Sequence, residues 1–239
     1  MLLEVCCGSL ASAIAAVQGG AQRIELCSAL SVDGLTPSIG LLRELRQRYP
    51  HLLIHVLIRP REGNFVYTED EIQVMLRDIA AAEEAGASAI VSGALTSQST
   101  IDLTTTSRLV RAAGDLPFTF HRAFDLVPDP FAALQQLQHL RVQRILTSGG
   151  APTAEAGIPL LRQLVQRAAA LSAKSPLPHG EGTGVGLLPG GGVTRHNARR
   201  ILQETGATEI HGSCSVTLPN GLRQTSADEV REVLKLISH

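Results

Sequence analysis

Short apolar runs recur along the whole chain, and the stretches between them carry apolar residues at helical spacing. Each run is rich in Val, Ile, Leu or Phe and has the length of a β-strand. Eight strands are predicted, at Leu2–Val5, Arg23–Leu26, Leu53–Ile58, Ala89–Val91, Phe118–His121, Arg144–Thr147, Gly186–Leu188 and Glu209–His211. Strands and helices therefore alternate from one end of the sequence to the other.

The stretches between the strands have the pattern of amphipathic helices. One of them places its apolar residues at Leu10, Ala13, Ile14 and Val17, and another at Ile72, Met75, Leu76 and Ile79. Helix starts are indicated by capping residues and by a proline at a first helical position. These signals stand at Ser9, Pro130, Thr194 and Ser226.

Three helix-to-strand junctions share a Gly-Ala pair, which begins at Gly20, Gly86 and Gly206. Glycine is the residue that most readily ends a helix in the left-handed conformation. Strands that alternate with helices form parallel sheets, and eight such units in 239 residues favour a closed (β/α)8 barrel of the TIM type over an open sheet. The fold class is thus α/β, with residues 1–239 forming a single barrel domain.

Alternation within the strands separates an outward face from an inward face. One parity is apolar and is expected to pack under the helices. It comprises Leu3, Val5, Ile24, Leu26, Ile54, Val56, Ile58, Phe118, Phe120 and Ile210. The opposite parity faces the lumen and is polar, with Glu4, Cys6, Arg23, Glu25, Cys27, His55, Arg59, Thr119, His121, Glu209, His211 and Ser213. Because unpaired buried charges are costly, we expect a paired, functional pocket in the upper lumen.

Composition and charge limit the classes of binding partner that the sequence predicts. The formal net charge is −1 and no run of like charge stands out, so no nucleic acid partner is expected. No apolar stretch approaches the length of about 18 residues that a membrane helix needs, and no membrane partner is expected either. Four cysteines are too few for a disulfide scaffold. We therefore expect a cytoplasmic protein with free thiols, and a flexible loop over the Pro- and Gly-rich residues 172–186.

Acid–base groups gather at the predicted C-terminal strand ends, where barrel enzymes place their catalytic residues. Glu4, Glu25, Arg59 and His121 are expected to share one cavity there, and Glu25, Arg59 and His121 are the candidates for catalysis. Asp125 is a further catalytic candidate that could orient His121 or Arg122. The alternative is a structural ion network, because Arg and Glu side chains inside a barrel can simply pair with each other. Arg23 and Glu209, further from the strand tops, are assigned to such a network.

Arginines and glycine-rich turns at the same end predict an anion site. The turns at Thr147–Gly150 and Gly190–Gly192 offer backbone N–H groups that can hold an anion. The candidate anion-binding residues are Arg59, Arg61, Arg122, Ser148, Gly149, Gly191 and Gly192. The only lysines are Lys174 and Lys235, neither in the lumen, which disfavours an aldolase that works through a lysine imine.

Two cysteines occupy equivalent positions after the first two strands. Cys6 and Cys27 would lie on neighbouring strands, and two thiolates suit a soft ion such as Cu(I). The alternative is that each thiol is a small buried apolar group, since two cysteines alone make an incomplete zinc site.

With these residues in place, the chain resembles the copper homeostasis protein CutC family over nearly its whole length. The shared motifs are Leu3–Cys6, Arg23–Cys27, Gly34–Ser38, Ile58–Arg61, Phe120–Asp125, Ile145–Gly149 and Gly190–Gly192. The resemblance implies a TIM-type barrel, a cytosolic location, homodimers and an association with copper, and it makes Cys6 and Cys27 the copper-binding pair. Gly8 and Asn64 depart from the family, which usually has acidic residues there.

Two functions remain open from the sequence. One is a cytoplasmic copper homeostasis protein that binds Cu(I). The other is a barrel enzyme, a lyase, isomerase or hydrolase, that acts on a small anionic or phosphorylated substrate through the polar ring.

Overall fold

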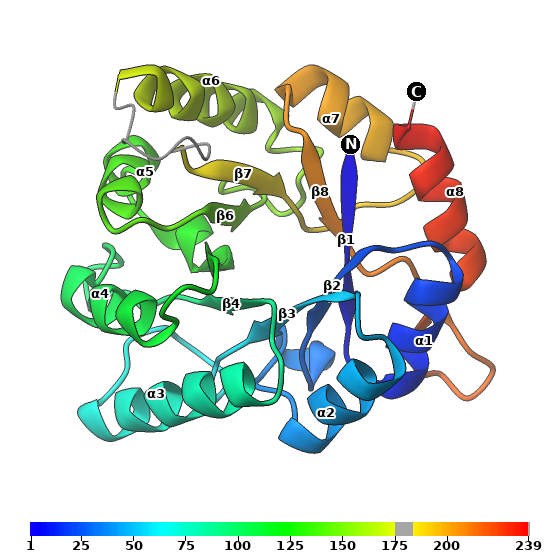
Figure 1. Cartoon of the computed structure of the whole chain (residues 1–239). Helices are drawn as coiled ribbons and strands as arrows, with labels where there is room; N and C mark the ends of the chain where they lie inside the picture. Colours follow the sequence, from blue (N-terminus) through cyan, green and yellow to red (C-terminus); the bar gives the residue numbers. More distant parts are fainter. Residues whose placement is uncertain (175–183, 239) are drawn as a thin grey trace.

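The computed structural model describes residues 1–174 and 184–238 and contains the predicted barrel (Figure 1). Its eight parallel strands are β1 Leu2–Cys7, β2 Arg23–Leu26, β3 Leu53–Leu57, β4 Ala89–Ser92, β5 Phe118–Phe120, β6 Arg144–Thr147, β7 Gly186–Pro189 and β8 Glu209–Gly212. The fold class and all eight predicted strands are confirmed, with β1 running on to Cys7.

The strands follow one another around the barrel in the order β7-β6-β5-β4-β3-β2-β1-β8. Strand β1 pairs with both β2 and β8, so the first and last strands of the chain are neighbours. Between β7 and β8 the described residues form one parallel bridge, from Gly190 to His211. The barrel is therefore nearly closed, and this bridge at His211 is the pairing that joins β7 to β8.

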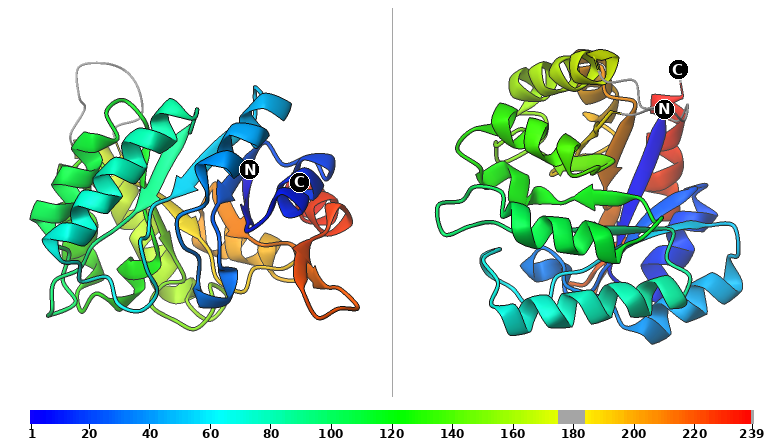
Figure 2. Two further views of the ribbon diagram at one scale, coloured as in Figure 1. Left: turned by 90° about the horizontal axis from the view of Figure 1, so that it is seen from below. Right: turned by 60° about the vertical axis from the view of Figure 1, so that its left-hand side comes forward.

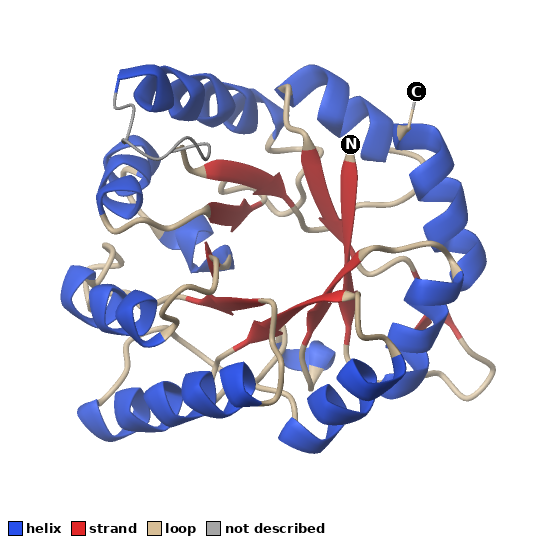
Figure 3. Cartoon of the chain, viewed as in Figure 1, coloured by secondary structure: helices blue, strands red, loops and turns tan. Residues whose placement is uncertain are grey.

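Helices surround the strands on the outside (Figure 3). They are α1 Leu10–Gln18, α2 Ile39–Arg48, α3 Glu69–Glu84, α4 Leu103–Ala112, α5 Pro130–His139, α6 Ile158–Lys174, α7 Ala198–Thr205 and α8 Ala227–Ile237, with 3₁₀ helices η1 Leu30–Val32 and η2 Arg122–Leu126. Among the described helices, none combines the length and apolar character that crossing a membrane requires.

The predicted helix ends are mostly confirmed. The Ser9 hydroxyl accepts the N–H of Ser12, and the Ser226 hydroxyl accepts that of Glu229. Pro130 opens α5. The prediction at Thr194 is wrong, because α7 begins only at Ala198 after a turn that Thr194 opens.

The three glycine junctions take the left-handed conformation that the Gly-Ala pairs predicted. Their φ angles are 100° at Gly20, 91° at Gly86 and 77° at Gly206. Most of the predicted loop 172–186 lies outside the described residues, at 175–183. At its ends, Ser172 belongs to α6 and Gly186 opens β7.

The two faces of the strands separate as their alternation predicted. The outward residues, such as Leu3, Ile24 and Phe120, are buried under the helices in one large apolar core. Each buried aliphatic side chain of this kind contributes about 1.5–3 kcal/mol. Inside the barrel lies a second, smaller apolar cluster made of Cys6, Cys27, Leu57 and Val91.

An antiparallel hairpin extends from the C-terminal side of β8. It consists of β9 Ser215–Thr217 and β10 Arg223–Thr225 and projects from the body of the barrel beside α1 (Figure 2).

Candidate functional site

The lower lumen is filled by a paired ion network. Nε of Arg23 lies 2.7 Å from Oε2 of Glu4, and Nδ1 of His55 lies 2.8 Å from the same oxygen. The other end of Arg23 contacts Glu209 at 2.6 Å, and Nε of Arg144 lies 3.0 Å from that carboxylate. The structural role predicted for Arg23 and Glu209 fits these contacts, and Glu4 joins them rather than the upper ring.

The Glu4 carboxylate stays charged although it is fully buried. Burial by itself raises the pKa of this group, but His55 and Arg23 outweigh burial and lower the pKa to about 2. In this network the carboxylates of Glu4 and Glu209 pair with the guanidinium groups of Arg23 and Arg144, below the residues of the upper lumen.

The two predicted metal ligands meet at the C-terminal ends of β1 and β2. The Sγ atoms of Cys6 and Cys27 lie 3.7 Å apart, and both thiols are buried in the lumen. The hydrogen bond to Cys27, burial and the nearby Glu25 carboxylate together raise the pKa of the Cys6 thiol well above its usual value. Without a metal, Cys6 is therefore a neutral thiol at physiological pH.

An imidazole–carboxylate pair lies beside the thiols. Nε2 of His211 lies 2.7 Å from Oε2 of Glu25, and one donor atom from each of Cys6, Glu25 and His211 falls within 4.8 Å of the other two. Burial opposes the charged imidazole, yet Glu25 outweighs burial and raises the pKa of His211. The sequence placed His211 in the lumen by parity but did not select it for the site.

His121, predicted as an acid–base group, lies apart from this cluster. Its Nδ1 accepts the backbone N–H of Ala123 at 3.3 Å, and its ring packs 4.8 Å from that of Phe65. Burial and the charge of Arg59 lower the pKa of His121 to about 3. The imidazole is therefore neutral, with its ring proton on Nε2 because Nδ1 accepts a hydrogen bond.

The two arginines that follow β3 are held mainly by backbone carbonyls of loops at this end of the barrel. Arg59 donates to the carbonyls of Val32, Gly34 and Gly63 and lies over the ring of Phe65.

Arg61 pairs with Glu71 and donates to the carbonyls of Glu62, Asn64 and Val66. Its guanidinium is thus bound on the outside of the barrel, and the structure does not bring Arg61 together with the lumen groups.

The glycine-rich turn after β6 binds the carboxylate of Asp125, an anion that belongs to the same chain. The backbone N–H groups of Ser148 and Gly150 donate to Oδ1 of Asp125, at 2.9 and 3.1 Å. Nε of Arg122 donates to the same carboxylate at 2.9 Å. Asp125 therefore orients Arg122, as one of its two predicted partners, while no contact joins it to His121 among the described residues.

The other predicted anion residues lie around this group. The α-carbon of Gly191 faces Arg122 and Ser148 so closely that a Cβ there would lie 3.4 Å from each. The N–H of Gly149 donates to the Thr147 hydroxyl, and the Gly192 carbonyl accepts the Asn197 amide. These glycines therefore shape the turns beside Arg122.

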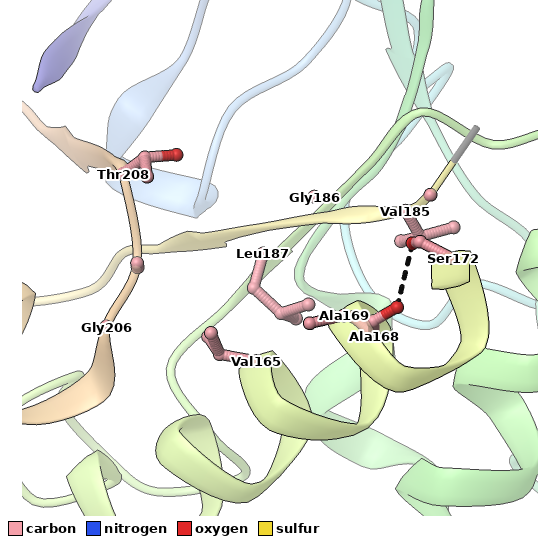
Figure 4. A pocket seen from close by; sticks show the side chains of 11 residues that line it. Val165, Ala168, Ala169, Ser172, Val185, Gly186, Leu187, Gly206 and Thr208 are labelled. Carbon is pink, nitrogen blue, oxygen red and sulfur yellow. Dashed lines mark hydrogen bonds between the residues drawn. The ribbon is translucent and has the colours of Figure 1, made fainter. Parts of the chain in front are cut away.

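A cavity of about 330 Å³ lies at the opposite end of the barrel (Figure 4). Its walls are mainly apolar, from α6 and β7, with residues such as Val165, Ala168 and Leu187. It contains none of the predicted site residues. Lys235 is exposed in the last turn of α8, and the side chain of Lys174 lies outside the described residues.

Fold and site together define a (β/α)8 barrel with a thiol pair and an acid–imidazole pair in its upper lumen. The model of the CutC family matches residues 1–216. The chain belongs to the CutC family.

Individual relatives agree with this assignment. The chain is 44% identical to a CutC family protein of Glaesserella parasuis, over 96% of this chain and 87% of the relative. It is 43% identical to the human copper homeostasis protein cutC homolog, over 93% of this chain and 76% of the relative. A crystal structure of CutC from Streptococcus agalactiae superimposes with a TM-score of 0.80 at 35% identity, covering 89% of this chain and 98% of that chain.

More distant barrels share the fold alone. Deoxyribose phosphate aldolase from Aeropyrum pernix superimposes with a TM-score of 0.66 at 13% identity, covering 98% of this chain and 89% of that chain. At this identity the likeness says nothing about the reaction.

Proposed function

We propose that this protein is a copper homeostasis protein that binds Cu(I) at Cys6 and Cys27. The observation that carries the proposal is the 3.7 Å separation of the two Sγ atoms inside the lumen. Soft thiolate ligands select Cu(I), and the human relative is named a copper homeostasis protein.

The donor set fits such an ion. Two collinear metal–sulfur bonds of about 2.3 Å each would hold the sulfur atoms further apart than the observed 3.7 Å, so this spacing suits a bent S–metal–S unit with room for a third donor. His211 and Glu25 are the donors next to Cys6. The neutral Cys6 thiol loses its proton when the metal binds, because the thiolate is the ligand.

An anaerobic titration with Cu(I) in the presence of a competing chelator tests the proposal. The double variant Cys6→Ser, Cys27→Ser is expected to lose tight binding. Cys214→Ser is the matched control, since Cys214 is also buried but is absent from the thiol cluster in the lumen. Parent-like affinity in the double variant would place the copper elsewhere and refute the proposal.

The cytoplasmic location and the homodimer remain predictions from the family. Fractionation of cells that express the protein tests the first, and sedimentation velocity of the purified protein tests the second. A monomer at micromolar concentration would contradict the homodimer.

The alternative function, an enzyme for a small anionic substrate, is supported by the buried cation of Arg59 beside the neutral imidazole of His121. A metabolite library screened by thermal shift tests it. A hit that disappears in Arg122→Gln or His121→Asn supports the alternative, and no hit among phosphosugars and carboxylates contradicts it.

A further inference from the structure

Arg59 is a buried cation without a counter-ion. Its side chain is 5% exposed, and its hydrogen bonds go to three neutral backbone carbonyls. Within the described parts of the chain, no carboxylate lies within 4.0 Å of its guanidinium, and its Nε has no acceptor. Arg23, the other buried arginine among the described residues, contacts the carboxylates of Glu4 and Glu209.

A charge in this position is costly unless an opposite charge joins it. The carbonyls accept from Nη1 and Nη2 but leave Nε without an acceptor and the net charge uncompensated in a low-dielectric environment. An anion that binds beside Arg59 would remove this cost.

A second orphan donor lies next to Arg59. Because Nδ1 of His121 accepts the N–H of Ala123, the ring proton is on Nε2. That Nε2 is buried and has no acceptor among residues 1–174 and 184–238, and the residue is 5% exposed. The charge of Arg59 helps to keep the imidazole neutral, so Nε2 remains a donor over the physiological pH range.

Phe65 links these two donors to a cavity. Its ring centroid lies 4.8 Å from that of His121 and 5.0 Å from Cζ of Arg59. Phe65 also lines a cavity of about 320 Å³ together with Leu95, Thr96, Ser97 and Leu126. Arg59 and His121 do not line this cavity, whereas Phe65 lines it and also contacts both donors.

We propose that Arg59 and His121 form a binding site for a small organic anion, with Phe65 as its movable wall. The carboxylate or phosphate group would accept from Nε of Arg59 and Nε2 of His121, and the remainder of the molecule would occupy the cavity. Its mixed lining of hydroxyl and aliphatic groups suits a short polar organic chain. This site uses neither residue of the thiol pair and does not require copper.

Calorimetric titration of the metal-free protein tests the proposal, with acetate and inorganic phosphate as probes at constant ionic strength. Saturable binding of at least one probe is expected, and the stronger one identifies the head group. Phe65→Ala is expected to bind the same probe more tightly, because the anion no longer has to displace the ring. Absence of binding to both the parent and Phe65→Ala overturns the proposal.

Substitution of Arg59 is a poor test because Arg59 also ties three loop carbonyls together. His121→Asn is better, since the asparagine oxygen can still accept the Ala123 N–H while the Nε2 donor is removed. We expect this variant to weaken binding by roughly tenfold or more, as for the loss of a hydrogen bond to a charged group. The exposed His196→Asn is the matched control and should bind like the parent.

Two further measurements distinguish this site from an anion site at the glycine turns. In ¹⁵N–¹H spectra of the histidine rings, the probe should shift the Nε2 signal that is missing in His121→Asn. The other candidate anion site lies at the glycine turns, which Arg122→Gln alters beside Gly191. Binding lost in Arg122→Gln but retained in His121→Asn would put the anion at the glycine turns and overturn the proposal.

Discussion

Glu4→Gln removes one charge from the floor of the lumen with little change of shape. In the parent protein the carboxylate is fully buried between Arg23 and His55, at 2.7 and 2.8 Å. The substitution leaves Arg23 paired with Glu209. Glutamine therefore mimics the protonated state of Glu4, and the variant isolates what the charge contributes.

The magnitude follows from the pKa of Glu4, which falls from 4.5 to about 2. Because the folded state binds this proton more weakly than the unfolded chain, the charge stabilises the fold above pH 4.5, and that stability is lost as the pH falls towards 2. A shift of this size corresponds to about 3 kcal/mol in the free energy of unfolding at pH 7. We expect the free energy of unfolding of Glu4→Gln to be lower than that of the parent by about 3 kcal/mol at pH 7. This difference in free energy should become smaller below pH 4.5.

Urea unfolding from pH 7 down to pH 3 measures this gap. Glu69→Gln is the matched control, because the pKa of Glu69 is also lowered to about 2 but its pair with Arg108 is exposed to solvent. Exposed pairs contribute little to stability. A loss below about 1 kcal/mol in Glu4→Gln, or a gap that stays constant down to pH 3, would refute the linkage reasoning.

Two other predictions concern the glycine turn and the thiols. Gly149→Ala should destabilise the protein by about 3 kcal/mol in urea unfolding, because φ is 73° and its Cβ would lie 2.7 Å from the Gly157 carbonyl oxygen. Gly150→Ala, with φ of 67° and its nearest neighbour at 3.9 Å, should cost only about 1–2 kcal/mol, and equal losses would contradict the steric argument. The affinity for Cu(I) in chelator competition should rise between pH 6 and 8, because the Cys6 thiol must lose a proton, and a flat profile would contradict that assignment.

Strand alternation predicted the barrel and the polar residues of its lumen, but it missed the apolar Leu57 and Val91, which lie with Cys6 and Cys27 inside the barrel. Within a parallel strand every second side chain points to the same side, so Cys6 and Cys27 could be placed near each other from their positions alone. The same rule placed His211 in the lumen. What alternation could not show was which lumen charges pair, and this is why Glu4 was grouped with the upper residues although it contacts Arg23.

Beyond the ends of the strands, alternation no longer predicts where a side chain points. Arg59 follows β3 and turns to carbonyls in two separate loops, a contact that depends on the tertiary path of the chain. Asp125 fills the glycine turn after β6 with its own carboxylate. The sequence shows that such turns can bind an anion, but it cannot show that the anion comes from the same chain.

X-ray absorption at the copper edge of the Cu(I)-loaded protein shows whether Cys6 and Cys27 hold the metal. We expect two sulfur neighbours at about 2.3 Å, from Cys6 and Cys27, with one nitrogen or oxygen neighbour completing the bent site. The sulfur signal should disappear in the double serine variant. A copper environment of nitrogen and oxygen alone, or two sulfur neighbours that persist in that variant, would rule out Cu(I) binding at Cys6 and Cys27.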